Sequence, residues 1–282
     1  MKQYILWILL LFLTINLQAL QPVTLIKTAN NIRKAVSVSS KTISIGKTAL
    51  QLGKCANAIP DKEIAKLAQI ATKPNGLKEI NKILGKANYI GKFGSKAGNQ
   101  ILQDAYLRIA VKNGRLSSKT ATEVLNHFND IPGLRSLLSK INSSSFSQSK
   151  GHLRELEIAL SAQKHGFSTL SFGQKFADGI KKGNTDLDVL LFKNGKKFAI
   201  ESKAYINKVP DSMVKADVQS LLAFCKNQKG TVPVFCFETA PSRYAGKYLL
   251  KNKIRCIVGT PDEIATKLDI LSTLYNKRFI KK

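Results

Sequence analysis

Apolar and polar positions follow two different patterns along the chain, and the change falls near residue 150. Between residues 61 and 133, apolar residues recur every three or four positions in "DKEIAKLAQIATK", "GLKEINKILGKANYIGKFG", "NQILQDAYLRIAVKNG" and "SSKTATEVLNHFNDIPG". This spacing is typical of amphipathic helices. We therefore expect residues 20–141 to form an all-α region.

The second pattern contains strands. The polar, Ser-rich stretch "INSSSFSQSKG" is expected to provide a linker over residues 142–150. After it come a helix in "HLRELEIALSAQKHGF", a short strand in "STLSF", an apolar hairpin, and then buried strands in "TVPVFCFET" and "IRCIVG", each preceded and followed by a helical stretch. This order predicts an α/β domain over residues 151–282, with a mixed sheet flanked by helices.

The hairpin has a defined turn. Its sequence is "TDLDVLLFKNGKKFAIESKAY", and Asn194-Gly195 stands between two β-forming runs. Both residue types accept the positive φ of a type I′ turn, so Asn-Gly is a strong hairpin signal. If these two residues form the turn, Lys193 pairs with Lys196, and the register of the whole hairpin follows.

That register brings charges together. It places Asp188 directly opposite Glu201 and Asp186 opposite Lys203. Opposed side chains lie about 4.5–5.5 Å apart at Cβ, and like charges at that distance destabilise a sheet. Alternation puts these four residues on one face and Leu187, Val189, Leu191, Ile200 and Ser202 on the other.

Two interpretations explain why Asp188 and Glu201 would lie opposite each other despite their like charge. One is a divalent cation between Asp188 and Glu201, since Mg²⁺ takes carboxylate, water and phosphate oxygens as ligands. Lys203 on the same face would then hold a phosphate or the attacking water and stabilise charge that develops in the transition state. The other interpretation is an ordinary hairpin with a solvated charged face, in which Asp186 forms an ion pair with Lys203.

The charge of the chain points to a polyanion. Among 282 residues there are 45 Lys and Arg against 18 Asp and Glu, a net charge of +27. Such an excess predicts binding to nucleic acid or to an anionic surface, although many lysines also serve only to keep a surface solvated. The four cysteines and three histidines show no zinc-ligand spacing, which argues against a zinc enzyme.

The N-terminus predicts export. "MKQY" precedes the apolar run "ILWILLLFLTINL", and Ala19 offers a small residue at a cleavage position. We expect residues 1–19 to be a signal peptide, with an uncleaved anchor as the weaker alternative. No second long apolar run follows, so we expect a secreted or periplasmic protein whose mature chain has no transmembrane span.

The order "GHLRELEIALSAQKHGF … TDLDVLLF … FAIESKAY … VQSLLAF", over roughly residues 150–240, resembles the PD-(D/E)XK nuclease superfamily with its restriction-endonuclease-like fold. In that family an Asp on the second core strand and an E-x-K on the third form the metal site. These positions fall on Asp188, Glu201 and Lys203. The leading "P-D" is replaced here by "T-D-L-D", which leaves Asp186 as a second candidate, although the pairing with Glu201 favours Asp188.

The resemblance implies two further site residues. A Glu on the preceding helix often completes the site, and either Glu155 or Glu157 fits, with Glu155 preferred by its distance from Gly166. A Gln on the helix after E-x-K often joins the substrate site, and Gln219 has that place.

Together these features predict a secreted nuclease that hydrolyses phosphodiester bonds of DNA or RNA, tRNA included, with Mg²⁺ or Mn²⁺ as cofactor. By analogy with small bacterial nuclease toxins that join a helical region to a C-terminal nuclease domain, we expect a toxin, for which an immunity protein would be a partner. The alternative is an exported basic protein that binds nucleic acid or anionic surfaces and has lost catalysis.

Overall fold

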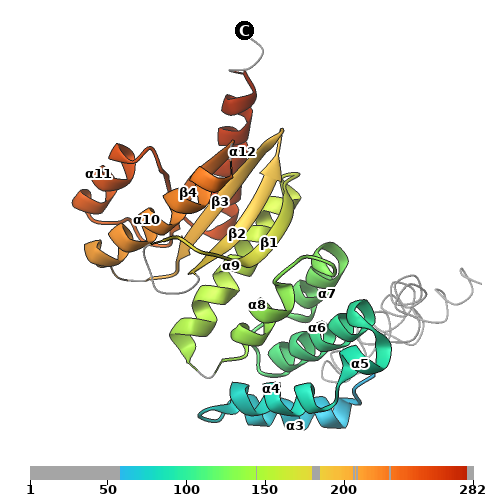
Figure 1. The fold of residues 1–282 in the computed structure, drawn as a ribbon. Helices are drawn as coiled ribbons and strands as arrows, with labels where there is room; N and C mark the ends of the chain where they lie inside the picture. Colours follow the sequence, from blue (N-terminus) through green and yellow to red (C-terminus); the bar gives the residue numbers. More distant parts are fainter. Residues whose placement is uncertain are drawn as a thin grey trace, which may run out of the picture. The chain divides into compact units, whose positions relative to one another are not determined.

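The first part of the described chain is helical, in agreement with its apolar spacing. The computed structural model describes residues 58–143, 145–179, 185–205, 207, 209–228 and 230–277, so the expected signal peptide lies outside the described residues. The helices before the sheet are α3 (Asp61–Ala71), α4 (Gly76–Lys86), α5 (Tyr89–Phe93), α6 (Ser95–Lys112), α7 (Ser118–Phe128), α8 (Leu134–Ile141) and α9 (Phe146–Lys164) (Figure 1).

The linker expected over residues 142–150 is largely wrong, because α9 begins at Phe146. Ser149 is buried rather than solvated, and its hydroxyl donates to the carbonyl oxygen of Ile141 at 2.9 Å. The Arg115 guanidinium donates to the same hydroxyl oxygen. These tertiary contacts satisfy a serine inside a helix, which the Ser-rich composition could not reveal.

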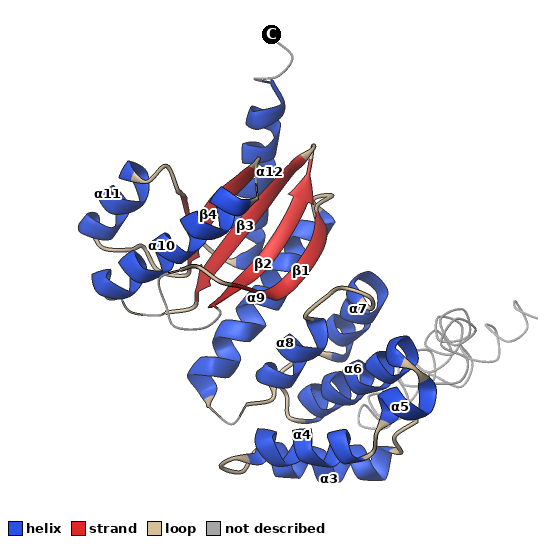
Figure 2. Ribbon diagram, in the orientation of Figure 1, coloured by secondary structure: helices blue, strands red, loops and turns tan. Residues whose placement is uncertain are grey.

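The second part of the chain is an α/β structure around a five-stranded mixed sheet (Figure 2). The strands lie in the order β1-β2-β3-β4-β5, antiparallel from β1 to β3 and parallel from β3 to β5. The elements are β1 (Ser168–Phe176), β2 (Thr185–Lys193), β3 (Lys196–Lys203), α10 (Asp211–Asn227), β4 (Thr231–Phe237), α11 (Arg243–Lys251), β5 (Arg255–Val258) and α12 (Pro261–Lys277).

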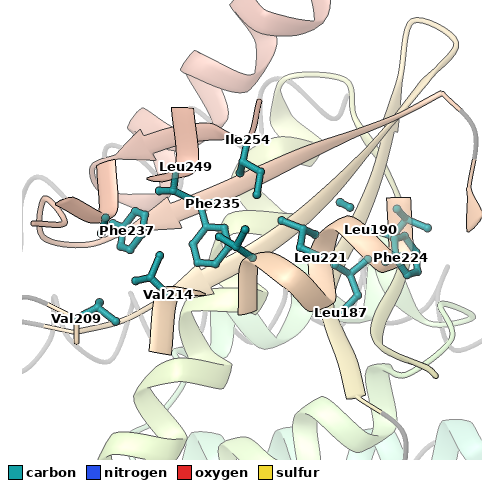
Figure 3. Packing of buried hydrophobic residues seen from close by; sticks show 13 residues of the cluster. Leu187, Leu190, Val209, Val214, Leu221, Phe224, Phe235, Phe237, Leu249 and Ile254 are labelled. Atoms are coloured by element: carbon teal, nitrogen blue, oxygen red, sulfur yellow. The ribbon is translucent and has the colours of Figure 1, made fainter. Parts of the chain in front are cut away.

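Helices cover both faces of this sheet, as predicted. In Figure 1, α10 and α11 lie in front of the sheet, and α9 and α12 lie behind it. The front layer buries a cluster in which Phe235 and Phe237 of β4 pack beneath Val214 and Leu221 of α10 (Figure 3). Burial of this apolar surface is the main force that holds α10 to the end of β3.

The hairpin turn and its register are confirmed. Asn194 and Gly195 have φ values of 52° and 74°, the positive values that a type I′ turn requires. Lys193 pairs with Lys196, and the ladder continues in the predicted register as far as Val189 and Ile200.

The register fails one residue further on. Asp188 does not pair with Glu201 in the ladder, which ends at Val189. Leu187 and Leu190 both belong to the cluster beneath α10, although three residues of regular strand would place them on opposite faces. The predicted alternation is therefore wrong at Leu187, and β2 is irregular at Asp188. The backbone of β2 leaves β3 at the point where the acidic residues lie.

The helical part packs directly on the sheet. The turn before α8 approaches β1 so closely that the Phe172 amide donates to the carbonyl oxygen of Pro132 at 2.9 Å. Gly133, with φ of 84°, has no room for a side chain there, because a Cβ would lie 1.8 Å from the Phe172 carbonyl oxygen. The rings of Phe128 and Phe172 meet edge to face. The described residues, which begin at 58 and end at 277, accordingly belong to one compact unit.

Across the residues that the structure describes, every helix is too short or too polar to traverse a lipid bilayer.

Candidate active site

Charged side chains gather at the C-terminal end of β3, where β2 leaves the sheet. Asp188 comes from β2, Glu201 and Lys203 from β3, Glu155 from α9 behind the sheet, and Asp217 from α10 in front of it. We call these five residues the Lys203 cluster. Its position at the carboxyl end of parallel strands is the usual place for a site in an α/β protein.

Lys203 is the centre of this cluster. Its Nζ lies 2.8 Å from Glu201 Oε1 and 2.7 Å from Asp217 Oδ2. Burial works against a charged ammonium, but the surrounding charges of Glu201, Asp217 and Asp188 outweigh it and raise the pKa of Lys203. The lysine is therefore a fixed cation, held by two carboxylates from different elements.

The Asp188 carboxylate accepts a backbone hydrogen bond that the β2–β3 ladder no longer provides. Because β2 has left the ladder, the backbone N–H of Ser202 donates to Asp188 Oδ2 at 2.7 Å. Burial and the neighbouring charge of Glu155 raise the pKa of Asp188 well above its usual range. The carboxyl group is thus held next to β3 by the strand irregularity itself.

Glu155 reaches the cluster from the other face. It is only 8% exposed, and its Oε1 lies 3.0 Å from His152 Nδ1. Burial, with the nearby charge of Glu201, raises the pKa of Glu155 to about 8. Burial and Lys140 lower the pKa of His152 to about 4, so the imidazole is neutral at pH 7. One hydrogen bond therefore joins two groups that are largely uncharged near neutral pH.

The Lys203 cluster contains more acidic groups than its one cation can neutralise. Burial and the charge of Asp188 raise the pKa of Glu201 to about 8 as well, even though Lys203 donates to it. Four carboxyl groups face a single ammonium, so in the absence of another cation some of them hold protons. A divalent cation would allow them to ionise.

The donor set suits a hard cation. Mg²⁺ and Mn²⁺ prefer carboxylate oxygens, and Mg²⁺ is often held by only one or two carboxylates while water and phosphate fill the other positions. In the described part of the chain, no three Asp, Glu, His or Cys side chains form a complete metal cage. Asp188 and Glu201 are the two residues of the cluster that could hold such an ion.

The structure distinguishes the residues in two choices that the sequence left open, Asp186 or Asp188 and Glu155 or Glu157. Asp186 is not in the cluster, because its side chain is 44% exposed and meets Lys140 at 3.4 Å, and the ladder between β2 and β3 ends before it could pair with Lys203. Glu157 lies apart from the cluster, where Arg154 is its neighbouring cation. Asp188 and Glu155 are the members that the fold brings together.

The structure does not bring Gln219 into the cluster, because this residue is exposed, and its expected role in substrate binding stays a prediction. Asp217 of the same helix faces Lys203, and two residues further on a helix has turned by about 200°. Asp217 and His152 were both missed. Asp217 could have been found from the buried Val214, Val218 and Leu221, which fix the face of α10 that meets the sheet.

Comparison with known proteins gives no relative: no family model, no curated protein and no solved structure matches this chain.

Proposed function

We propose that the protein is a metal-dependent nuclease that hydrolyses phosphodiester bonds of DNA or RNA at the Lys203 cluster, and that its α/β part has a restriction-endonuclease-like fold. The observation that carries this proposal is the convergence of Asp188, Glu201 and Lys203 at the end of β3, with Glu155 reaching them from α9. The net charge of +27 supports a polyanionic substrate.

Each residue has a role in this proposal. Asp188 and Glu201 would hold Mg²⁺ or Mn²⁺, which supplies a Lewis acid for the phosphoryl oxygen and an activated water when it is bound. Lys203 keeps its proton and directs a fixed positive charge towards a non-bridging phosphate oxygen, so that it stabilises the charge that develops there. Glu155, with a pKa of about 8, holds or accepts a proton at the edge of the site.

The wider biological proposal is that the protein is exported and acts as a toxin, with an immunity protein as its partner. It rests on the apolar N-terminus and on the order of a basic helical part followed by the sheet.

The activity is tested with the mature chain, incubated with DNA and with tRNA in Mg²⁺, in Mn²⁺ and in EDTA. We expect cleavage that requires the metal and is lost in Glu201→Ala and Lys203→Ala. Glu79→Ala, which changes an exposed carboxylate on α4, is the matched control and should cleave like the wild type. Cleavage that survives both EDTA and the two substitutions would refute the mechanism.

The ion pairs of Lys203 also support a second candidate function. Lys203 is fully engaged by Glu201 and Asp217, so the cluster can also serve as a buried ionic contact that fixes α10 on β3. The protein would then bind nucleic acid without cutting it. In the same experiment this function appears as metal-independent retention of DNA or tRNA with no cleavage of either.

A further inference from the structure

A second polar pocket lies in the helical part of the chain, outside the Lys203 cluster. It has a volume of about 390 Å³ and lies between one side of α6, the turn from α7 to α8, and the first turn of α8. This volume is within the range of small-molecule sites, which is about 300–1,000 Å³. Its lining includes the basic residues Lys96 and Arg135 and the amide side chains of Asn99, Gln103 and Asn129.

Two amide oxygens of this pocket are unsatisfied. Gln103 is 4% exposed, and its Oε1 is buried without a hydrogen-bond partner among the described residues. Asn129 Oδ1 is also buried without one. Buried polar atoms are almost always paired, so two unpaired acceptors in one pocket point to a ligand that brings N–H donors.

Positive charge lies at the rim of the same pocket. Arg135 Nη1 donates to Asn99 Oδ1 at 2.6 Å, which fixes the guanidinium beside the pocket while the residue stays exposed. Lys96 is also exposed and lies 3.1 Å from Asp130. Arginine and lysine in such positions bind phosphate oxygens, with arginine the more directional of the two.

A nucleotide has both kinds of group. Asn and Gln side chains recognise the edges of bases, where their oxygens accept from amino or ring N–H groups. The phosphate would lie against Arg135 and Lys96 at the rim. We propose that this pocket binds one nucleotide of a nucleic-acid chain, with Gln103 and Asn129 at its base edge.

The position of the pocket connects it to the Lys203 cluster. Arg135 begins α8 beside the pocket, and Lys140 ends the same helix, 3.4 Å from Asp186 of β2. The charge of Lys140 also acts on Glu155 of the cluster, so α8 extends from the pocket towards the site. The pocket would therefore select a base near the bond that is cut. This second step rests on the proposed nuclease function, whereas nucleotide binding does not.

Binding is measured first, without cleavage. Adenosine, guanosine, cytidine and uridine 5′-monophosphates are titrated into the mature wild-type chain in EDTA by calorimetry, up to millimolar concentrations. We expect one of the four to bind more tightly than the others. Gln103→Met should weaken it at least tenfold, and Arg135→Gln should weaken all four.

Two matched controls accompany these variants. Gln100→Met lies on the same helix but outside the pocket, and Arg243→Gln removes an exposed arginine of α11; both should bind like the wild type. If Gln103→Met does not fold, as judged by circular dichroism, Arg135→Gln decides alone. The proposal is overturned if the wild type binds none of the four nucleotides, or if the folded pocket variants bind them unchanged.

A separate readout addresses specificity. Sequencing of the ends produced by wild-type cleavage should show a preferred base near the cut, and Gln103→Met should lose that preference while it still cleaves. Glu201→Gln should bind the nucleotide normally but not cleave. Failure of the nuclease therefore removes cleavage only, whereas failure of the pocket removes binding and base preference.

Discussion

Replacement of Glu201 by glutamine should stabilise the metal-free protein, and the effect should grow with pH. The pKa of this carboxyl rises from 4.5 to about 8 in the fold. A group with a raised pKa contributes stability below its unfolded value, and this contribution is lost as the pH rises towards the folded value. At 1.36 kcal/mol per pKa unit the loss is about 5 kcal/mol at pH 8 and close to zero at pH 4.5.

Glutamine keeps the shape of the side chain and an oxygen that accepts from Lys203, but it never ionises. Water that enters the site reduces the cost of the charge, so we expect Glu201→Gln to raise the free energy of unfolding by about 2–3 kcal/mol at pH 8. At pH 4.5 the two proteins should differ little.

Urea unfolding of both proteins in EDTA at these two pH values measures the difference. Glu79→Gln, in an exposed position of α4, is the control and should change the stability by less than about 0.5 kcal/mol at either pH. If Glu201→Gln is no more stable than the wild type at pH 8, or differs from it equally at both pH values, the description of a proton-holding, cation-deficient cluster is wrong.

Three further predictions follow from the same structure. Mg²⁺ at pH 8 should raise the Tm of the wild type by several degrees in scanning fluorimetry but leave Asp188→Asn unchanged, and an equal rise in both would place the ion elsewhere. Lys203→Gln leaves two carboxylates without their cation and should cost about 3 kcal/mol in urea unfolding at pH 8; unchanged stability would contradict the ion-pair geometry. Gly133→Ala should cost more than about 3 kcal/mol, because the new Cβ would meet the Phe172 carbonyl, whereas Gly114→Ala, also at positive φ but in open space, should cost about 1 kcal/mol; equal losses would argue against the close approach to β1.

Part of the hairpin structure could be predicted from the sequence and part could not. Asn194-Gly195 specified the turn, and the turn determined the pairing up to Val189 and Ile200, because each of those pairs depends only on local backbone geometry. The break at Asp188 depends on a side chain that takes the place of a backbone acceptor for Ser202. No propensity or periodicity contains that substitution.

Of the two acidic residues that helices contribute to the cluster, one was predicted from the sequence and one was not. Glu155 could be preferred from the sequence only by its distance from Gly166, as the family resemblance implies, because Glu155 and Glu157 both flank the apolar face of α9. Asp217 could not be recognised by its residue type, and the signal for it was the apolar face of α10, which sets how the helix rotates over the sheet and so brings Asp217 to Lys203. The helical turn at Phe146–Lys150 escaped notice because tertiary partners, not the composition, satisfy Ser149.

The account depends most directly on a divalent cation bound between Asp188 and Glu201. Titration of the mature protein with Mn²⁺ at pH 8, with free ion followed by electron paramagnetic resonance, measures this binding without any substrate. We predict one Mn²⁺ per wild-type chain and at least tenfold weaker binding in Glu201→Gln. A wild type that binds no Mn²⁺, or a variant that binds it as tightly, would contradict the account.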